Sequence, residues 1–225
     1  MIIQNKGNHL TGYIPVTSEE DTSVFLDFGL IQLKEGGMFS GEAAKERVFL
    51  LIQGESVVEL GSERYPVRRT SFLDENPVCF HLPPGVPLNI TAQSSCEFAC
   101  AALENDKNFE PHVYSQEECR TEVFGQGTLD DAALRIVRTV FDDSNAPFSN
   151  LVVGEVVNFP GRWSSYPPHS HVQPEIYHYR LVPEQGFGFC GQGEQANIVH
   201  DRDTAVIPGG VVHPQVAAPG YAMLM

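Results

Sequence analysis

Positively charged residues are scarce in this sequence. Its 225 residues include 14 Lys and Arg against 29 Asp and Glu, which gives a formal net charge of −15. A surface of this kind repels the phosphate backbone of nucleic acids and the headgroups of anionic membranes. We therefore expect a protein that binds neither nucleic acid nor a membrane.

Signals for membrane insertion, export and disulfide formation are also missing. No apolar run approaches the ~18 residues of a membrane-spanning helix, and the first residues, MIIQNK, lack the cationic and apolar layout of a signal peptide. The five cysteines include no Cys-x-x-Cys spacing, so we expect neither a cysteine zinc site nor a disulfide framework. The prediction is a cytoplasmic protein in which Cys96 and Cys100 are buried free thiols.

Helical spacing of apolar residues is hard to find, whereas short apolar runs between turn signals are common. These runs are rich in Val, Ile, Phe and Tyr. Many short strands at such intervals are typical of a β-sandwich or β-barrel. We expect strands in Val24–Leu33, Val48–Ile52, Val57–Leu60, Asn89–Ala92, Leu134–Phe141, Asn150–Phe159, Glu175–Val182 and Thr204–Pro208. The sequence therefore predicts an all-β fold.

A faint internal repeat divides the chain. Pro83–Leu88 and Pro208–His213 share the frame Pro-x-Gly-x-x-(Leu or His), and each follows a strand-like run. An acidic residue opens an earlier apolar run in each half, Glu46 in the first and Glu175 in the second. The polar stretch Asn105–Asp131 has the composition of a linker. We predict two domains, residues 1–110 and 111–225.

The strongest chemical signal is the segment PPHSHVQPE, which contains His169, His171 and Glu175. Residues i and i+2 of a strand face the same way, so the two imidazoles can point to one place. His213 follows the second Pro-x-Gly frame, which turns the chain back toward the barrel. Three imidazoles and a carboxylate predict a divalent metal site with positions left open for water or substrate. The first half has Leu88 in place of His213, so we expect it to bind no metal.

Four further side chains are candidates for the chemistry around the metal. Tyr177 and Tyr179 share the strand face of Glu175 by parity, and either hydroxyl can hold a substrate or relay a proton. Arg162 precedes the site and can pair with a carboxylate through its planar guanidinium. Arg180 can do the same, although parity places it on the opposite face of the strand.

These residues lie in strings that resemble a known family. The His-x-His, Glu and Pro-x-Gly-x-x-His elements resemble the two cupin motifs. The surrounding sequence is similar to the 5-deoxy-glucuronate isomerase family of inositol catabolism, which is related to the 4-deoxy-5-ketouronate isomerases. The similar strings are NFPGRWSSYPPH (158–169), EIYHYR (175–180), PEQGFGF (183–189) and VHPQVAAPGY (212–221).

The resemblance implies a bicupin, with a metal-free cupin in the first half and a metal-binding cupin in the second. It also implies a metal-dependent aldose–ketose isomerase that converts 5-deoxy-glucuronate to 5-dehydro-2-deoxy-gluconate. One divalent ion is expected, and Zn, Mn, Fe, Co and Ni all accept this ligand set. The general base is left open among Tyr177, Tyr179 and Glu175. The alternatives are a cupin oxygenase and a non-catalytic protein that binds a sugar acid. The exposed sheet edges of a bicupin favour a homo-oligomer.

Overall fold

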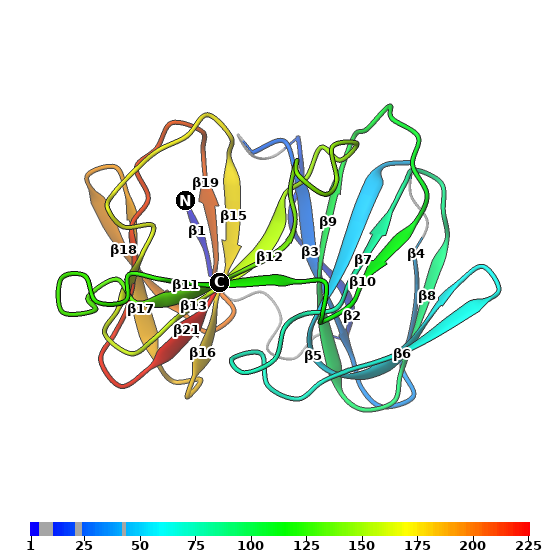
Figure 1. The fold of residues 1–225 in the computed structure, drawn as a ribbon. Helices are drawn as coiled ribbons and strands as arrows, with labels where there is room; N and C mark the ends of the chain where they lie inside the picture. The colour runs from blue at the N-terminus through cyan, green and yellow to red at the C-terminus, as the bar shows by residue number, and fades with distance from the viewer. Residues whose placement is uncertain (5–10, 21–23, 42–43) are drawn as a thin grey trace.

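The computed structural model describes residues 1–4, 11–20, 24–41 and 44–225. Throughout these residues the regular elements are β-strands, and no helix occurs among them. No described segment therefore forms a helix long and apolar enough to cross a membrane. The strands gather into two groups that lie side by side, one for each half of the chain (Figure 1).

The first group forms a nine-stranded sheet in which β5 is the hub, because it pairs with β6, β7, β8 and β9. The main path of the sheet runs in the order β10-β7-β5-β9-β3-β2, and β4 joins through β8. The strands are β2 (Gly12–Thr17), β3 (Asp27–Leu33), β4 (Met38–Gly41), β5 (Glu46–Leu60), β6 (Glu63–Arg69), β7 (Cys79–Leu82), β8 (Leu88–Ala92), β9 (Cys96–Leu103) and β10 (His112–Tyr114).

The second group consists of a three-stranded, a five-stranded and a four-stranded sheet. The first has the order β1-β19-β15, with β1 (Ile2–Ile3), β19 (Thr204–Ile207) and β15 (Glu175–His178). The second has the order β11-β12-β13-β21-β16, with β11 (Arg120–Phe124), β12 (Arg135–Phe141), β13 (Val153–Asn158), β21 (Ala222–Leu224) and β16 (Arg180–Val182). The third has the order β14-β20-β17-β18, with β14 (Trp163–Ser164), β20 (Gln215–Ala217), β17 (Phe187–Gln192) and β18 (Gln195–His200).

The predicted all-β fold is therefore confirmed, and all five cysteines are free and buried. Backbone pairing crosses the predicted boundary at residue 110 in both directions. β10 pairs with β7 of the first group, and β1 pairs with β19 of the second. The division into 1–110 and 111–225 stays a prediction.

The apolar run in β5 is continuous because the strand is buried on both faces. Phe49 and Leu51 point into the core of the first group. Val48 and Leu50 point the other way, into a second cluster that also contains Phe141 from the second half of the chain. A third cluster fills the second group. The two halves are thus joined by an apolar layer.

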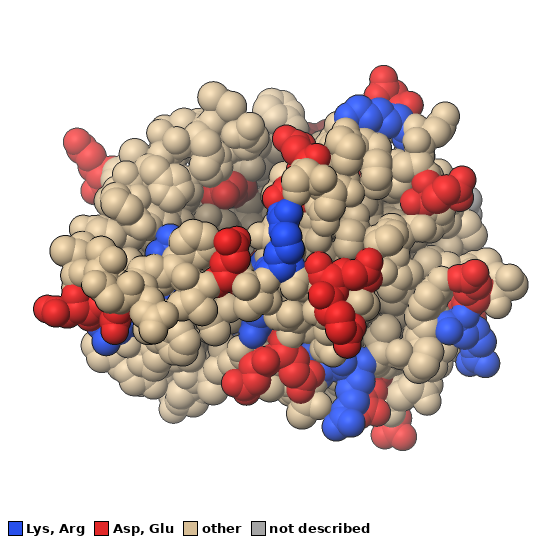
Figure 2. Space-filling view, in the orientation of Figure 1, with Lys and Arg blue, Asp and Glu red and all other residues tan. Residues whose placement is uncertain are grey.

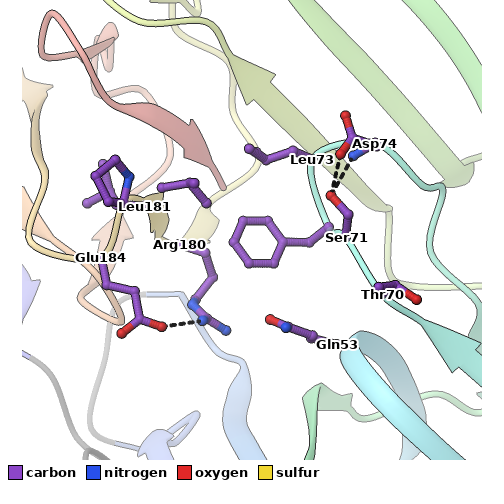
Figure 3. A pocket seen from close by; sticks show the side chains of 11 residues that line it. Gln53, Thr70, Ser71, Leu73, Asp74, Arg180, Leu181 and Glu184 are labelled. Carbon is purple, nitrogen blue, oxygen red and sulfur yellow. Dashed lines mark hydrogen bonds and ion pairs between the residues drawn. The ribbon is translucent and has the colours of Figure 1, made fainter.

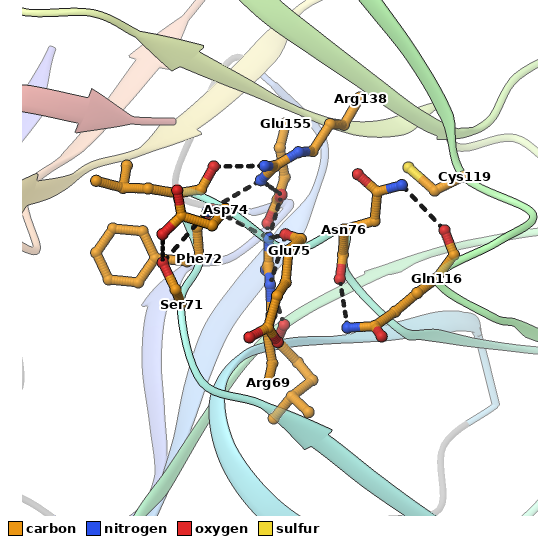
Figure 4. Close-up of polar contacts among 12 residues, drawn as sticks. Arg69, Ser71, Phe72, Asp74, Glu75, Asn76, Gln116, Cys119, Arg138 and Glu155 are labelled. Carbon is orange, nitrogen blue, oxygen red and sulfur yellow. Dashed lines mark hydrogen bonds and ion pairs between the residues drawn. The ribbon is translucent and has the colours of Figure 1, made fainter.

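A buried ionic cluster lies beside this layer (Figure 4). The Arg69 guanidinium donates two hydrogen bonds of 2.7 Å to the two carboxylate oxygens of Glu155. Arg138 lies 3.4 Å from the same carboxylate and donates to the Phe72 carbonyl at 2.7 Å. Arg69 comes from the first half and Glu155 from the second. The cluster therefore fixes the position of one half against the other, because separating them would leave buried charges without a counter-charge.

Replacing Glu155 by Gln should strongly destabilise the protein, because two buried guanidinium groups then lose their counter-charge. We expect the free energy of unfolding to fall by about 3–5 kcal/mol. Glu59→Gln is the matched control, because Glu59 forms an exposed pair with Arg64 and such pairs contribute less than about 1 kcal/mol. Urea unfolding of both variants measures the difference, and equal effects would show that the buried cluster does not hold the halves together.

Candidate metal centre

The candidate ligands come from two loops and the start of one strand. His169 and His171 lie in the loop between β14 and β15, and Glu175 is the first residue of β15. His213 lies between β19 and β20. The His-x-His segment forms no strand, so the strand expected there from the spacing of the histidines is absent. Loop structure nevertheless brings the two rings together.

The three imidazoles converge. One ring nitrogen from each of His169, His171 and His213 lies within 4.8 Å of the other two. The Glu175 carboxylate joins them, with Oε1 3.3 Å from His171 Nε2 and Oε2 3.1 Å from His213 Nε2. His213 is buried and His169 is exposed. The cluster is therefore closed on one side and open to solvent on the other.

Backbone carbonyls fix the orientation of every ring. The Nδ1 atoms of His169, His171 and His213 lie 3.0, 2.8 and 2.8 Å from the carbonyl oxygens of residues 167, 173 and 211. A carbonyl only accepts, so each Nδ1 must carry the proton and donate it. In the neutral imidazole each Nε2 is then an unprotonated acceptor, which is the form in which histidine binds metals.

The donor set fits a divalent cation. Glu175 Oε2 and His213 Nε2 are buried and have no hydrogen-bond partner, although they lie only 3.1 Å apart. Two acceptors at this distance repel each other, whereas a cation between them would satisfy both. Three imidazole nitrogens and one carboxylate are a ligand set used by several transition metals.

Glycine in the Pro208–Gly210 turn allows the second loop to approach the histidines. β15 pairs with β19 so that Glu175 lies opposite Ile207, and the turn follows at once. The Gly210 N–H donates to the His171 carbonyl at 2.7 Å. A Cβ added to Gly209 would lie 2.1 Å from the Val172 carbonyl oxygen. Gly209 is the x of the Pro-x-Gly frame, and the glycine of the frame itself, Gly210, has a φ of +82°, in the left-handed region that favours glycine.

Tyr177 lies beside the cluster, whereas Tyr179 lies in the core of the second group. The Tyr177 ring centroid is 6.1 Å from that of His213, and its hydroxyl is 3.5 Å from Ser165 Oγ. Burial, with the nearby Glu175 carboxylate, raises the pKa of Tyr177, so its hydroxyl is protonated at neutral pH. Tyr179 is fully buried and donates to Gln215 Oε1 at 2.8 Å.

Gln215 is a residue that the sequence reasoning missed. It is completely buried, and its Nε2 donates to the His213 carbonyl at 2.8 Å. The chain Tyr179–Gln215–His213 therefore links the barrel interior to the cluster. The available signal was a polar residue two positions after His213, at the first position of a short strand.

The two candidate arginines contact groups outside the histidine cluster. Arg162 donates to the Asp130 carbonyl at 3.1 Å. Arg180 is 3% exposed and pairs with Glu97 at 2.6 Å and Asp201 at 3.0 Å. It lines a cleft of about 380 Å³ between the two halves, where Figure 3 shows it beside Glu184. Their assignments to substrate binding stay predictions.

In the first group, a cationic side chain corresponds in position to Glu175, the carboxylate of the candidate site. The residue before Pro83 pairs with Arg47, just as the residue before Pro208 pairs with Glu175. Arg47, rather than Glu46, is thus the counterpart of Glu175. Its guanidinium is buried and donates to the carbonyls of Gly41 and Val86. Glu46 faces the layer between the halves, 2.6 Å from His81 Nε2.

Comparisons with known proteins identify the family of the chain. The sequence model of the KduI/IolB family matches residues 2–224. The 5-deoxy-glucuronate isomerase of Geobacillus kaustophilus is 25% identical over 242 residues, covering 98% of this chain and 85% of that protein. The enzyme of the same name from Bacillus subtilis strain 168 is 25% identical over 225 residues, covering 92% and 81%.

Solved structures show the same fold. An IolB-like protein from Salmonella typhimurium superposes with a TM-score of 0.85 at 23% identity, covering 99% of this chain and 89% of that one. Oxalate decarboxylase from Lactobacillus farciminis gives a TM-score of 0.66 at 13% identity, covering 96% and 82%. A cupin 2 barrel protein from Leptotrichia buccalis gives 0.57 at 11%, covering 100% and 94%. The predicted bicupin fold is confirmed.

Removing His213 should weaken metal binding without unfolding the barrel. We expect His213→Ala to lower the affinity for Co²⁺ by at least about 100-fold, because the buried ligand that faces Glu175 is lost. Visible absorption during a Co²⁺ titration of the metal-stripped protein measures binding without any need for activity. The exposed His112→Ala is the control and should bind like the wild type. Unchanged Co²⁺ affinity in His213→Ala would contradict the assigned centre.

Proposed function

The chain belongs to the KduI/IolB family, and from this premise we propose that it is a metal-dependent aldose–ketose isomerase. Its substrate is 5-deoxy-glucuronate and its product is 5-dehydro-2-deoxy-gluconate, a step in the breakdown of myo-inositol. The convergence of three imidazoles and the Glu175 carboxylate carries the proposal. The names of the curated relatives support the choice of substrate. Five buried free cysteines suit a cytoplasmic enzyme.

His169, His171, Glu175 and His213 hold the metal in this proposal. A divalent ion at this place supplies a Lewis acid that polarises the substrate carbonyl and the neighbouring hydroxyl. The exposed side of the cluster, at His169, admits the substrate. The buried side, at His213, faces the barrel interior, where Tyr177 is partly buried against the core.

The isomerisation moves one hydrogen from the hydroxyl-bearing carbon to the aldehyde carbon and transfers one proton between the two oxygens. No external oxidant or reductant is needed. We assign Tyr177 the proton transfer at the substrate oxygens, because its hydroxyl lies beside the cluster and contacts Ser165. Tyr179 acts as a positioning residue, since its hydroxyl is committed to Gln215.

Arg162 is the better candidate to bind the substrate carboxylate. Its contact with the Asp130 carbonyl uses one guanidinium nitrogen and leaves the charge without a carboxylate partner among the described contacts. Arg180 is already neutralised by Glu97 and Asp201, which makes it a less available anion partner.

The His169→Ala variant tests the metal requirement. We expect its isomerase activity, followed by proton NMR of the sugar acid, to fall at least about 100-fold, because one ligand on the solvent side is lost. His200→Ala is the control at an exposed histidine. Full activity in His169→Ala would make us withdraw the proposal. Oxygen uptake would instead mark an oxygenase, and tight binding of the sugar acid without turnover would mark a binding protein.

The Tyr177→Phe variant separates proton transfer from metal binding. We expect kcat to fall about 100-fold, the usual contribution of a positioned acid or base, with unchanged Co²⁺ affinity. Tyr65→Phe serves as the control, because Tyr65 lies in the first group and contacts Glu63. A Tyr177→Phe enzyme with wild-type kcat would rule out this role for the hydroxyl.

A further inference from the structure

Ser165 has a backbone conformation that a serine side chain disfavours. Its φ is +50°, which lies in the left-handed region. Eleven described positions with positive φ hold glycine, which adopts such angles without strain because it has no Cβ. A serine in the same region is strained, and strain of this kind is typical of functional sites, where the surrounding structure maintains it. The strain at Ser165 therefore indicates a use for its side chain.

The left-handed backbone turns the Ser165 side chain toward the barrel interior. The preceding residue, Ser164, ends β14 and is 1% exposed, and its Oγ lies 4.0 Å from Met225 Sδ in the core of the second group. In an unbroken strand the next side chain would point to the opposite face. Ser165 Oγ instead lies 3.5 Å from the hydroxyl of Tyr177, which packs against the same core. Two neighbouring serine hydroxyls thus face one core.

The contact with Tyr177 explains why residue 165 is serine rather than glycine. Glycine would give the same turn without strain, but it has no hydroxyl. Among the described residues, Tyr177 is the hydrogen-bond partner of Ser165 Oγ. A tyrosine hydroxyl both donates and accepts, so a bond to Ser165 leaves it able to bond a substrate oxygen as well. Contacts at catalytic sites are often long before the substrate binds, as the 3.5 Å distance is here.

The negative charge of the molecule makes directed contacts important for a sugar acid. The chain has a net charge of −15, and carboxylates are spread over both halves of the face in Figure 2. A surface of this sign does not attract an anionic substrate from a distance. The substrate must then be held by short-range contacts at the site, and a hydroxyl that transfers protons must already be in place.

We infer that Ser165 is a positioning residue, whose left-handed backbone aims its hydroxyl at Tyr177 and so fixes the Tyr177 hydroxyl toward the substrate oxygens. This inference rests on the proposed function, because Ser165 acts through the proton transfer assigned to Tyr177. One substrate oxygen releases a proton and the other receives one by way of Tyr177, while Ser165 keeps its own proton. No other reactant takes part.

Steady-state kinetics of Ser165→Ala and Ser165→Gly test the role of the hydroxyl. Both substitutions remove it, and only glycine also relieves the backbone. We expect kcat to fall about tenfold in both, the effect of one hydrogen bond, with unchanged KM and Co²⁺ affinity. Ser165→Gly should not lower the midpoint of thermal unfolding. Ser164→Ala removes the neighbouring hydroxyl and is the control, with wild-type kcat. Wild-type kcat in both Ser165 variants, or a kcat that falls only together with Co²⁺ affinity, would overturn the inference.

Combining the substitutions shows whether Ser165 acts through Tyr177. In the Tyr177→Phe background, Ser165→Ala should change kcat by less than about twofold, because the hydroxyl that it positions is already missing. A further tenfold loss in the double variant would reveal an independent role and contradict the inference.

Carbon NMR of protein with ¹³Cζ-labelled tyrosine tests the contact without any need for activity. The chain has seven tyrosines, and Tyr177→Phe identifies the Tyr177 signal by its loss. Ser165→Ala should shift this signal and leave the other tyrosine signals in place. An unchanged Tyr177 signal would overturn the inference. A wild type without isomerase activity would instead contradict the proposed function, and the Tyr177 signal would then decide alone whether Ser165 positions this hydroxyl.

Discussion

The site depends on four acceptors held close together. With neutral imidazoles, the Nε2 atoms of three histidines and the carboxylate of Glu175 are four acceptors that lie close together with no donor among them. Their mutual repulsion is offset by the structure around them. Backbone carbonyls hold each Nδ1, and the pairing of β15 with β19 sets the position of Glu175. A fold that maintains such an arrangement is prepared for a cation.

The first half of the chain builds its strands with a charge of opposite sign at the position that Glu175 has in the second half. Arg47 occupies the place of Glu175 and bonds two carbonyls, so a side-chain cation cross-links the loops. The apolar layer and the buried Arg69–Glu155 pair then join this half to the other. Glu155 lies on β13, which is paired with β21, and β21 is paired with β16. The contact between the halves therefore also supports β16 and β21, the strands that follow β15 and β20 in the chain.

The sequence predicts most of this arrangement because its signals are local. Parity along a strand correctly groups Tyr177 with Glu175, and the Pro-x-Gly frame locates His213. The features that the sequence does not predict depend on contacts between residues far apart in the chain. The expected strand 175–182 is interrupted at Tyr179, where the chain passes from one sheet to another. Only register reveals that Arg47 replaces Glu175, and only packing reveals the bond between Gln215 and the His213 carbonyl.

The most direct test is proton NMR of 5-deoxy-glucuronate with the purified protein, with and without a chelator. Our account predicts loss of the aldehyde or hemiacetal signal of the substrate. Turnover should stop when the chelator removes the metal and return when Mn²⁺, Fe²⁺, Co²⁺, Ni²⁺ or Zn²⁺ is restored. Turnover that persists in the fully metal-stripped protein would contradict the account, and so would its absence after every one of these metals has been supplied.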